Sequence, residues 1–399
     1  MALYLSKPGI MSCAGNNIEE LWESVTSGNQ TQIKKVTACT GEDFYAARVS
    51  DSNLKAAKAR YDMRIIRIEE AAINQLTNEI NTAISRYGSE RLAVCVGSCD
   101  NGTEFSLAGH RKFFAEEKFP QEYNIEMQGA DYVATYISER FGIKGPCSAF
   151  STACSSSASA IIKAAELIMG DLADAVIAGG VDIASDTTLV GFNALEAVSS
   201  EITNPFSKNR HGITLGDGAA FFVLSREPLS DTAQSTKQIQ LLGWGESADA
   251  YHMTSPDPTG AGAERAIRLA LENACLQTKD VGYINMHGTG TKFNDSMEAK
   301  AISAVFGENS VAVSTTKPVT GHTLGAAAAL ELAVCWAALS EQKRLPLQVW
   351  DGQQDPELPK LNIVDKNNKL AAEGGKELKV CLSNSFAFGG ANACLVLSL

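Results

Sequence analysis

Several features that mark other classes of protein are missing from this sequence. No apolar run reaches the roughly 18 residues that a helix needs to cross a bilayer, so no membrane span is predicted. Residues 1–15 contain one lysine and a short apolar stretch broken by Pro8, which is a poor match to a signal peptide. The net charge of −12 argues against a nucleic-acid partner.

Recognisable cofactor and disulfide patterns are also missing. The ten cysteines form neither a disulfide-like framework nor a zinc-like CxxC pair, and Cys95 and Cys99 are best interpreted as small buried apolar residues. This usage suits a reducing compartment, so a cytoplasmic location is predicted. The GAGAE segment at 260–264 lacks a third glycine and a preceding strand, and no GxxxxGK[ST] motif occurs. No cofactor is therefore predicted.

The remaining pattern is that of a large α/β protein. The chain has 399 residues, more than one hydrophobic core usually serves. Strand-like and helix-like segments alternate, with helices expected at 52–87, 130–141, 153–169 and 324–339, and strands at 92–97, 173–179, 282–286 and 378–383. Residues from about 180 to 210 are expected to form a long loop. A polar stretch at 226–238 divides the chain into predicted halves, 1–230 and 231–399.

One cysteine stands at the start of a helix that is almost entirely alanine and serine in its first half. Cys154 lies in the segment STACSSS. The positive end of a helix dipole favours a thiolate, so we expect a lowered pKa and a nucleophilic sulfur. A buried structural role is the more common use of such a cysteine and stays open on this argument alone.

Two of the five histidines lie in glycine-flanked loops after predicted strands. His287 precedes Gly288, and His322 follows Gly321. Imidazoles beside a thiolate can donate hydrogen bonds to an oxygen that gains negative charge. A structural role for each histidine remains an alternative. Zinc bound by Cys154 and both histidines is disfavoured, because the helix after Cys154 offers no fourth ligand, and no metal is predicted.

Four motifs occur in an order that resembles one enzyme family: TACSSS at 152–157, HGTGT at 287–291, KPVTGHTLGAA at 317–327 and NSFAFGG at 384–390. They resemble the elongating β-ketoacyl-acyl carrier protein synthases, types I and II, over nearly the whole chain. Initiating type III enzymes use Cys-His-Asn, whereas His322 gives this chain Cys-His-His. The resemblance implies an α/β thiolase-like fold, a duplicated five-layer α-β-α-β-α body that is normally dimeric.

The resemblance also implies a role for each motif residue. Cys154 would take an acyl chain from an acyl carrier protein, and His287 and His322 would promote decarboxylation of malonyl carrier protein. The backbone N–H groups of Cys154 and Phe388 would form an oxyanion hole, and the Phe388 side chain would gate the site. Lys317 would orient the histidines, paired with Glu298. The remaining matches are a buried acid, Glu331, and two pantetheine-binding residues, Thr289 and Thr291.

Two positions depart from the family pattern without removing a catalytic group. Ala387 stands before the gating Phe388 where glycine is usual, which we expect to limit the freedom of the gate. His211 stands where an aspartate is common. Neither departure touches the predicted nucleophile or its histidines.

A basic cluster provides a candidate docking surface for the acidic carrier protein. Its members, crowded near one predicted helix start, are Lys55, Lys58, Arg60, Arg64 and Arg67. A solvated basic face with no partner is the alternative reading. We will call these five residues the basic cluster.

The finer resemblance is to synthases of aryl polyene pathways, on the segments at 191–200, 241–258 and 383–392. It implies a homodimer, or a heterodimer with a chain-length-factor-like homologue. The first alternative function is a non-catalytic chain-length-factor-like subunit, but these usually lack the reactive cysteine. The second is a thiolase, which needs a second cysteine in a CxG motif, and Cys394 has no such glycine.

Overall fold

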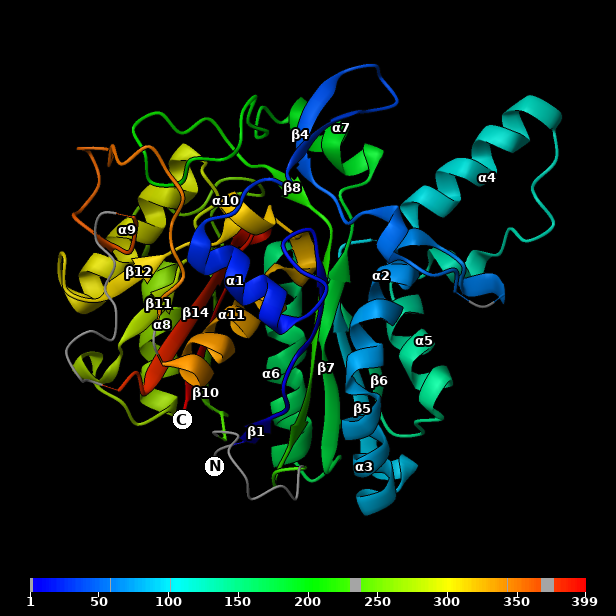
Figure 1. The fold of residues 1–399 in the computed structure, drawn as a ribbon, viewed down its shortest axis with the longest axis horizontal. Helices are drawn as coiled ribbons and strands as arrows, with labels where there is room; N and C mark the ends of the chain where they lie inside the picture. The colour runs from blue at the N-terminus through cyan, green and yellow to red at the C-terminus, as the bar shows by residue number, and fades with distance from the viewer. Residues whose placement is uncertain (1–2, 58, 101, 230–237, 343, 367–376) are drawn as a thin grey trace.

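The structure is a computed structural model that describes the whole chain except residues 1–2, 58, 101, 230–237, 343 and 367–376. Its largest feature is a twelve-stranded mixed sheet (Figure 1). The first-half strands are β1 Leu3–Leu5, β2 Gly9–Ser12, β5 Leu92–Gly97, β6 Cys147–Phe150, β7 Ala175–Asp182 and β9 Gly218–Ser225. The second-half strands are β10 Gln240–Ala248, β11 Tyr283–Asn285, β12 Ala312–Ser314, β13 Asn362–Ile363, β14 Val380–Phe386 and β15 Ala391–Ser398.

The two halves of the sheet repeat one topology. In the first half the strand order is β6-β5-β7-β9-β2, and in the second it is β12-β11-β14-β15-β10. In each, the first three strands are parallel and the last two pairings are antiparallel. The short strand β1 pairs with both β9 and β10 and joins the halves. The predicted boundary between residues 230 and 231 lies outside the described residues and stays a prediction.

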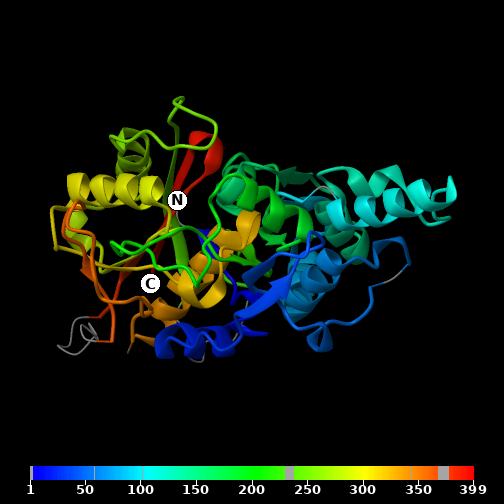
Figure 2. The same cartoon turned by 90° about the horizontal axis from the view of Figure 1, so that it is seen from above.

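Helices cover the sheet in layers that share three hydrophobic cores. The outer face of the first half packs against α2 Arg64–Ile73, α3 Thr77–Tyr87 and α5 Tyr132–Phe141. The inner faces of both halves enclose α6 Ser156–Met169 and α11 Ala327–Glu341. The outer face of the second half packs against α8 Ala261–Asn273 and α9 Lys292–Phe306. This order confirms the five-layer, thiolase-like α-β-α-β-α architecture (Figures 1 and 2).

The strands carry the two-residue alternation that such layering requires. In β5, Leu92, Val94 and Val96 belong to the outer core, whereas Ala93 and Cys95 belong to the inner core. Since both faces are buried, the strand reads in sequence as a continuous apolar run. The amino-acid sequence therefore specifies a doubly covered strand here, and the structure confirms it.

The two inner helices approach the strands closely because their residues are small. A Cβ on Gly97 of β5 would lie 2.2 Å from the main-chain nitrogen of Ser157, so only glycine fits there. The second inner helix, with its preceding turn, forms the 18-residue segment Leu324–Glu341, which is long and apolar enough to cross a membrane. A helix was expected at 324–339, but an apolar segment of this length was not. Within the protein 83% of this segment is buried, which is typical of the core helix of a globular protein.

Three segments differ from the sequence prediction. Residues 52–87 are not one helix: short 3-10 turns at Asp51–Asn53 and Ala59–Tyr61 precede α2, and another at Asn74–Leu76 separates α2 from α3. Helix α4, Thr103–Glu116, was not predicted, and α7, Asp186–Ala194, lies within the expected loop. Helix α4 projects from the body, so no core imposes an apolar period on it (Figure 2).

The remaining elements lie near the loops that carry the predicted catalytic residues. They are α1 Ile18–Ser27, the three-stranded sheet of β3 Lys34–Thr37, β4 Asp43–Ala47 and β8 Leu215–Gly216, and the short helix α10 Lys317–Thr320. Strand β8 forms a bridge to His322, and the Gly216 N–H donates to the His322 carbonyl at 3.0 Å. The small sheet thus supports the loop that carries the second predicted histidine.

Candidate active site

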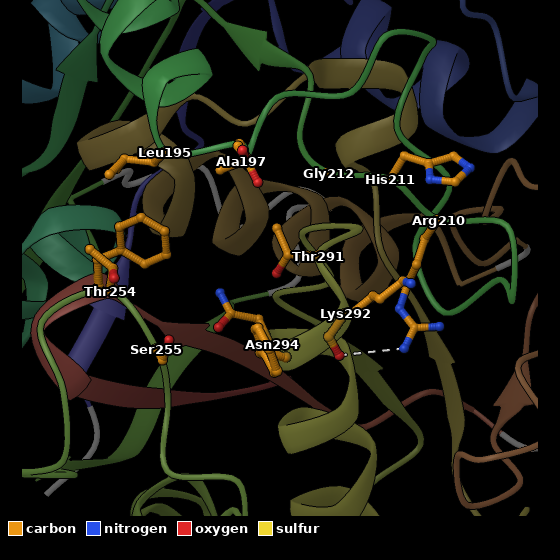
Figure 3. Close-up of a pocket in the computed structure, with 13 residues that line it drawn as sticks. Leu195, Ala197, Arg210, His211, Gly212, Thr254, Ser255, Thr291, Lys292 and Asn294 are labelled. Atoms are coloured by element: carbon orange, nitrogen blue, oxygen red, sulfur yellow. Dashed lines mark hydrogen bonds between the residues drawn. The ribbon is translucent and has the colours of Figure 1, made fainter.

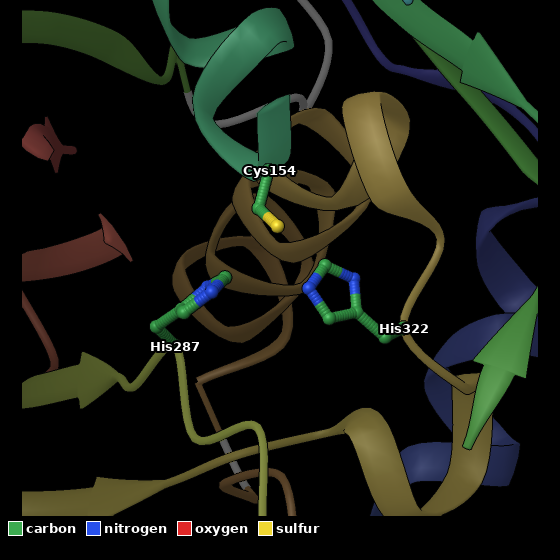
Figure 4. A group of neighbouring side chains, drawn as sticks. All are labelled: Cys154, His287 and His322. Atoms are coloured by element: carbon green, nitrogen blue, oxygen red, sulfur yellow. The ribbon is translucent and has the colours of Figure 1, made fainter. Parts of the chain in front are cut away.

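The predicted nucleophile lies at the meeting point of the two halves. Cys154 belongs to the 3-10 turn Ala153–Ser155 that leads into α6, and its side chain is buried. Ala153 has a φ of 51°, a sharp left-handed turn that an L-residue rarely adopts. The sulfur points at the rings of His287 and His322 (Figure 4), and one atom from each of the three side chains lies within 4.8 Å of the others.

His287 is held by its own loop after β11. Both N–H groups of His287 and Gly288 donate to the Glu298 carboxylate at 2.8 Å. Burial raises the pKa of Glu298 to about 7, and these two amides oppose the shift. The expected pairing of Glu298 with Lys317 is wrong, since Glu298 is engaged by the loop backbone instead.

Lys317 is a buried cation with a different partner. Its ammonium pairs with Glu331 and also donates to the His287 carbonyl. Burial raises the pKa of Glu331 to about 7, although Lys317 lowers it. The ammonium also lies 3.3 Å from His287 Nδ1. The Lys317 ammonium thus lies against the first histidine, and its carboxylate partner is Glu331 rather than Glu298.

The hydrogen bonds at the ring nitrogens fix the protonation pattern of both histidines. His287 Nδ1 faces the Lys317 ammonium, and His322 Nδ1 accepts from the Leu324 N–H at 3.1 Å. Burial lowers the pKa of each imidazole well below 6.5, and Lys317 lowers both further. Each ring is thus neutral at pH 7, with its hydrogen on Nε2. Two N–H donors are left to face the sulfur.

The position of the ring hydrogens determines whether His287 and His322 can act as hydrogen-bond donors or as metal ligands. A metal needs the lone pair of a neutral imidazole nitrogen, and here Nε2 carries the hydrogen in both rings. Moving the hydrogen to Nδ1 would set it against the Leu324 N–H in one ring and the Lys317 ammonium in the other. The arrangement therefore suits hydrogen-bond donation to a substrate oxygen and does not fit zinc.

The electrostatics of Cys154 differ from the sequence expectation. Burial raises its pKa to about 11, while Lys317 and the backbone N–H groups of Phe388 and Cys154 lower it. The expected net lowering of the pKa is wrong, because the desolvation of a buried thiolate outweighs the effect of the helix end. The same two N–H groups are those predicted for the oxyanion hole, and they both bear on the sulfur.

Phe388 lies at the mouth of the site in the turn Phe388–Gly390, between β14 and β15. Its ring contacts that of Phe192 from α7, with centroids 5.8 Å apart. The Gly389 N–H donates to the Met253 carbonyl at 2.7 Å, which ties the turn to the loop after β10. Ala387 is extended, with φ −97°, so this backbone conformation does not require glycine there.

Phe388 is one of the residues that line a cavity of about 480 Å³. Figure 3 shows the cavity with Thr254 and Ser255 on one side and Thr291 and Lys292 on the other. Thr291 lines it, and Thr289, which is buried, lies 3.0 Å from Thr291 through their hydroxyl oxygens. His211, one of the departures from the family pattern, also lines the cavity. Sequence reasoning did not single out the other polar residues around it, which are Glu196, Arg210, Thr254, Ser255, Lys292 and Asn294. A stretch such as 208–212 carries no motif, so only the fold gathers these side chains.

Comparisons with known proteins agree with this geometry. The family description "Beta-ketoacyl synthase, N-terminal domain" matches residues 9–229, and "Beta-ketoacyl synthase, C-terminal domain" matches residues 239–348. The chain belongs to the β-ketoacyl synthase family. Together the matched segments hold Cys154, His287, Lys317 and His322.

Two curated members of the family are similar over nearly their whole length. The 3-oxoacyl-[acyl-carrier-protein] synthase 2 of Vibrio harveyi is 33% identical, covering 97% of this chain and 96% of that protein. The synthase of the same name from Staphylococcus aureus is 30% identical, over 97% of this chain and 98% of that protein.

Solved structures give the same family and add two assemblies. A chain from the ketosynthase ApeO in complex with its chain length factor ApeC, from Xenorhabdus doucetiae, superposes with TM-score 0.90 at 35% identity, covering 100% of this chain and 98% of that chain. A chain of the ishigamide ketosynthase/chain length factor superposes with TM-score 0.87 at 26% identity, covering 100% and 98% of the respective chains.

The basic cluster of this synthase is largely occupied by carboxylates. Arg60 pairs with Glu126 and Glu139, and Arg67 pairs with Asp62. Arg64 pairs with Asp51 and with the buried Asp217. Lys55 is exposed, and Lys58 lies outside the described residues. Much of the charge that the sequence predicted as a docking surface is thus engaged within the chain.

Proposed function

We propose that this synthase is an active condensing enzyme that joins an acyl chain to a malonyl unit, both delivered by acyl carrier protein. In the first half-reaction, the Cys154 sulfur attacks the acyl thioester, the acyl–sulfur bond to pantetheine breaks, and the proton from Cys154 leaves with the carrier thiol. In the second, malonyl carrier protein loses CO₂, and the resulting enolate attacks the acyl-Cys154 carbonyl. The bond between the acyl carbon and the Cys154 sulfur breaks, the sulfur leaves as a thiolate that takes up a proton from water, and the β-ketoacyl carrier protein is the product.

The pair of Nε2–H donors facing the Cys154 sulfur carries this proposal. As CO₂ leaves, negative charge develops on the malonyl thioester oxygen, and donors already in place stabilise it. Both imidazoles stay neutral because burial and Lys317 lower their pKa. The N–H groups of Cys154 and Phe388, which both act on the Cys154 sulfur, would receive the second oxyanion at the acyl-Cys154 carbonyl.

The leading alternative is a non-catalytic, chain-length-factor-like subunit. Such a subunit needs the fold and a partner surface but has no use for a nucleophile. In this chain the nucleophile, both donors and their ammonium converge, and Lys317 is buried at the cost of desolvation. A complete catalytic set of this kind favours the enzyme.

The partner that we propose is a second, homologous chain. Strand β6 ends the sheet order, and its residues are half-buried or exposed, so its outer edge lacks a cover within the described chain. Nearby, α4 and the following turn expose Phe114 and Ile125, at 81% and 76%. A strand from another chain satisfies such an edge. The assemblies of ApeO with ApeC and of the ishigamide proteins support a chain-length-factor-like partner, and a second copy is the other choice.

The carrier protein would reach Cys154 through the cavity outside Phe388. Thr289 and Thr291 would hydrogen-bond its pantetheine arm there. Docking of the acidic carrier on the basic cluster remains part of the proposal, with Lys55 as an exposed contact. Charge reversal at Arg64 would not test it cleanly, because that change also sets a new carboxylate against Asp217.

We also propose a pathway and a cellular location for this synthase. The similarity to a chain of the ApeO–ApeC complex and the segments named above support the growth of an aryl polyene chain. A cytoplasmic location agrees with the cysteines, since all ten are free thiols. Neither point follows from the catalytic geometry.

Intact-mass measurement after incubation with a panel of acyl carrier proteins tests the enzyme. The wild-type chain should gain one acyl mass, and Cys154→Ala should gain none. Cys99→Ser serves as the matched control, since Cys99 lies beside the same turn but outside the proposed chemistry, and it should still be acylated. An adduct that persists in Cys154→Ala, or none in the wild type with any carrier, would refute the proposal.

A further inference from the structure

Asp182 is a buried carboxylate that the mechanism above does not use. It is the last residue of β7 and is 1% exposed. One of its oxygens, Oδ2, accepts two main-chain hydrogen bonds, from the Cys99 N–H at 2.8 Å and from the Gly325 N–H at 2.7 Å. Those two donors belong to different halves of the molecule. Asp182 Oδ2 therefore links the first half of the chain to the second through two main-chain hydrogen bonds.

The first of these bonds leads to the nucleophile. Cys99 follows β5, and its thiol lies 3.3 Å from the Ala153 carbonyl and 3.7 Å from the Ser156 hydroxyl. These two residues flank Cys154 in the turn that aims the sulfur. A shift of the Cys99 main chain would move the Ala153 carbonyl that its thiol contacts. Ala153 already has an uncommon φ of 51°, so a small displacement there would change the direction of the Cys154 side chain.

The second bond leads to the histidine. Gly325 lies in the 3-10 turn Leu324–Ala326, and the preceding residue, Leu324, gives the N–H that occupies His322 Nδ1. Leu324 also has a positive φ, 51°. Fixing the Gly325 amide therefore fixes the neighbouring amide that keeps the His322 hydrogen on Nε2.

The backbone segments around Asp182 pack too closely to admit larger residues at two neighbouring glycines. A Cβ on Gly325 would lie 2.7 Å from Asp182 Oδ2 and 2.9 Å from the Cys99 nitrogen. A Cβ on Gly180 would lie 2.7 Å from the Gly97 carbonyl oxygen and 2.8 Å from the Ser157 Cβ. The two catalytic turns and the end of β7 thus touch through backbone, and only a carboxylate-sized acceptor fits between them.

We propose that Asp182 is a positioning residue that sets the separation of the nucleophile turn and the His322 turn. The inference rests on the proposed condensation at this site. Its consequence is specific to the step that uses both turns at once. Self-acylation needs the Cys154 sulfur and its oxyanion hole, whereas decarboxylation and attack also need His322 placed against the acyl-Cys154 group.

Asp182→Ala removes the acceptor, and Asp182→Asn keeps one oxygen in its place. Burial raises the pKa of Asp182 to about 7, so the neutral amide is a fair substitute for a group that is partly uncharged at that pH. Enzyme is first loaded with an acyl chain, and intact mass gives the fraction carrying it. CO₂ release from malonyl carrier protein is then measured per acylated site, together with the KM for the carrier.

We expect Asp182→Ala to be acylated but to release CO₂ roughly 10- to 100-fold more slowly per acylated site, the scale of a misplaced catalytic group. The KM should be unchanged, and Asp182→Asn should restore most of the rate. Glu69→Ala is the control: Glu69 is also a fully buried carboxyl group, but it lies on α2, which packs on the outer face of the first half. Its per-site rate should match the wild type even if its stability falls.

The outcomes separate this inference from the proposed function. A wild-type chain that neither takes an acyl group nor releases CO₂ would refute the function itself. A working wild type with a normal per-site rate in Asp182→Ala would overturn the positioning role. If Asp182→Ala does not fold, Asp182→Leu and Asp182→Asn are compared instead, and equal per-site rates in any folded variant lacking the acceptor would also overturn it.

Discussion

At the scale of single residues, the site depends on two buried charges that neutralise each other. Lys317 and Glu331 form an ion pair with almost no solvent contact. Burying such charges costs free energy, and their pairing offsets that cost. The chain keeps them because the ammonium also faces His287 Nδ1 and lowers the pKa of both histidines. Stability and catalysis therefore use the same ammonium group in separable ways.

A double-mutant cycle tests that separation. Lys317→Met leaves Glu331 buried without its cation, so we expect a loss of roughly 3 kcal/mol in the free energy of unfolding. Adding Glu331→Gln should recover most of this loss, because the uncompensated carboxylate is then gone. Urea unfolding of the wild type, both single variants and the double variant measures the cycle.

Activity should not follow stability in the same cycle. The double variant still lacks the donor to His287 Nδ1, so CO₂ release from malonyl carrier protein should remain roughly 100-fold below the wild type. Recovery of both stability and decarboxylation in the double variant would show that Lys317 acts only as a counter-ion.

At the scale of elements, the turn between β14 and β15 carries Phe388, whose ring is the proposed gate and whose N–H is a proposed oxyanion donor. Gly389 has a φ of 83° with open space where a Cβ would stand, so an alanine there is strained without a clash. We expect Gly389→Ala to lose about 1–2 kcal/mol of stability. Acyl transfer should also slow, by up to about 100-fold, because the neighbouring Phe388 N–H moves.

Gly352→Ala is the matched control for this turn. Gly352 has a φ of 73° and equally open surroundings, but it lies in a loop that holds none of the catalytic residues. Thermal unfolding should show a similar loss in both variants, while single-turnover acylation should slow only in Gly389→Ala. Equal acylation rates would mean that the turn does not position the donor.

At the scale of the whole molecule, the uncovered edge of β6 predicts an assembly. The Pro146 carbonyl accepts from the Val94 N–H of β5, and the Phe150 carbonyl accepts from the N–H of Ser98, just after β5. The alternate residue, Ala149, therefore directs its N–H to the open edge. Ala149→Pro removes that N–H, and Ala149→Val keeps it. Light scattering should give twice the 42.4 kDa chain mass for the wild type and the Val variant, and a single chain mass for the Pro variant.

The same measurement distinguishes the two kinds of partner. A wild type that stays at 42.4 kDa alone and forms a complex only with a chain-length-factor-like homologue would identify the heterodimer. An Ala149→Pro variant that keeps its partner would refute pairing through β6. Circular dichroism of each variant shows whether it is folded.

The sequence by itself determined the chemistry-bearing residues and the layered class of fold. Cys154, His287, Lys317 and His322 stand in short motifs at the ends of apolar strands or helices, where local pattern and residue type carry the signal. The doubly buried strands and the small-residue helices also follow from local composition, because covering both faces of a sheet demands continuous apolar runs. Helix α4 was not predicted from the sequence, because a helix that projects from the body need not have an apolar face with helical periodicity.

Only the tertiary structure decided how those residues are coupled. It assigned Glu331 rather than Glu298 to Lys317 and raised the pKa of Cys154 through burial. It also paired Arg60 and Arg64 of the basic cluster with carboxylates distant in sequence. It also placed Asp182 between two catalytic turns, 83 residues from one partner and 143 from the other. Partner choice, burial and long-range hydrogen bonds depend on which segments the fold brings together, and no local pattern in the sequence records that.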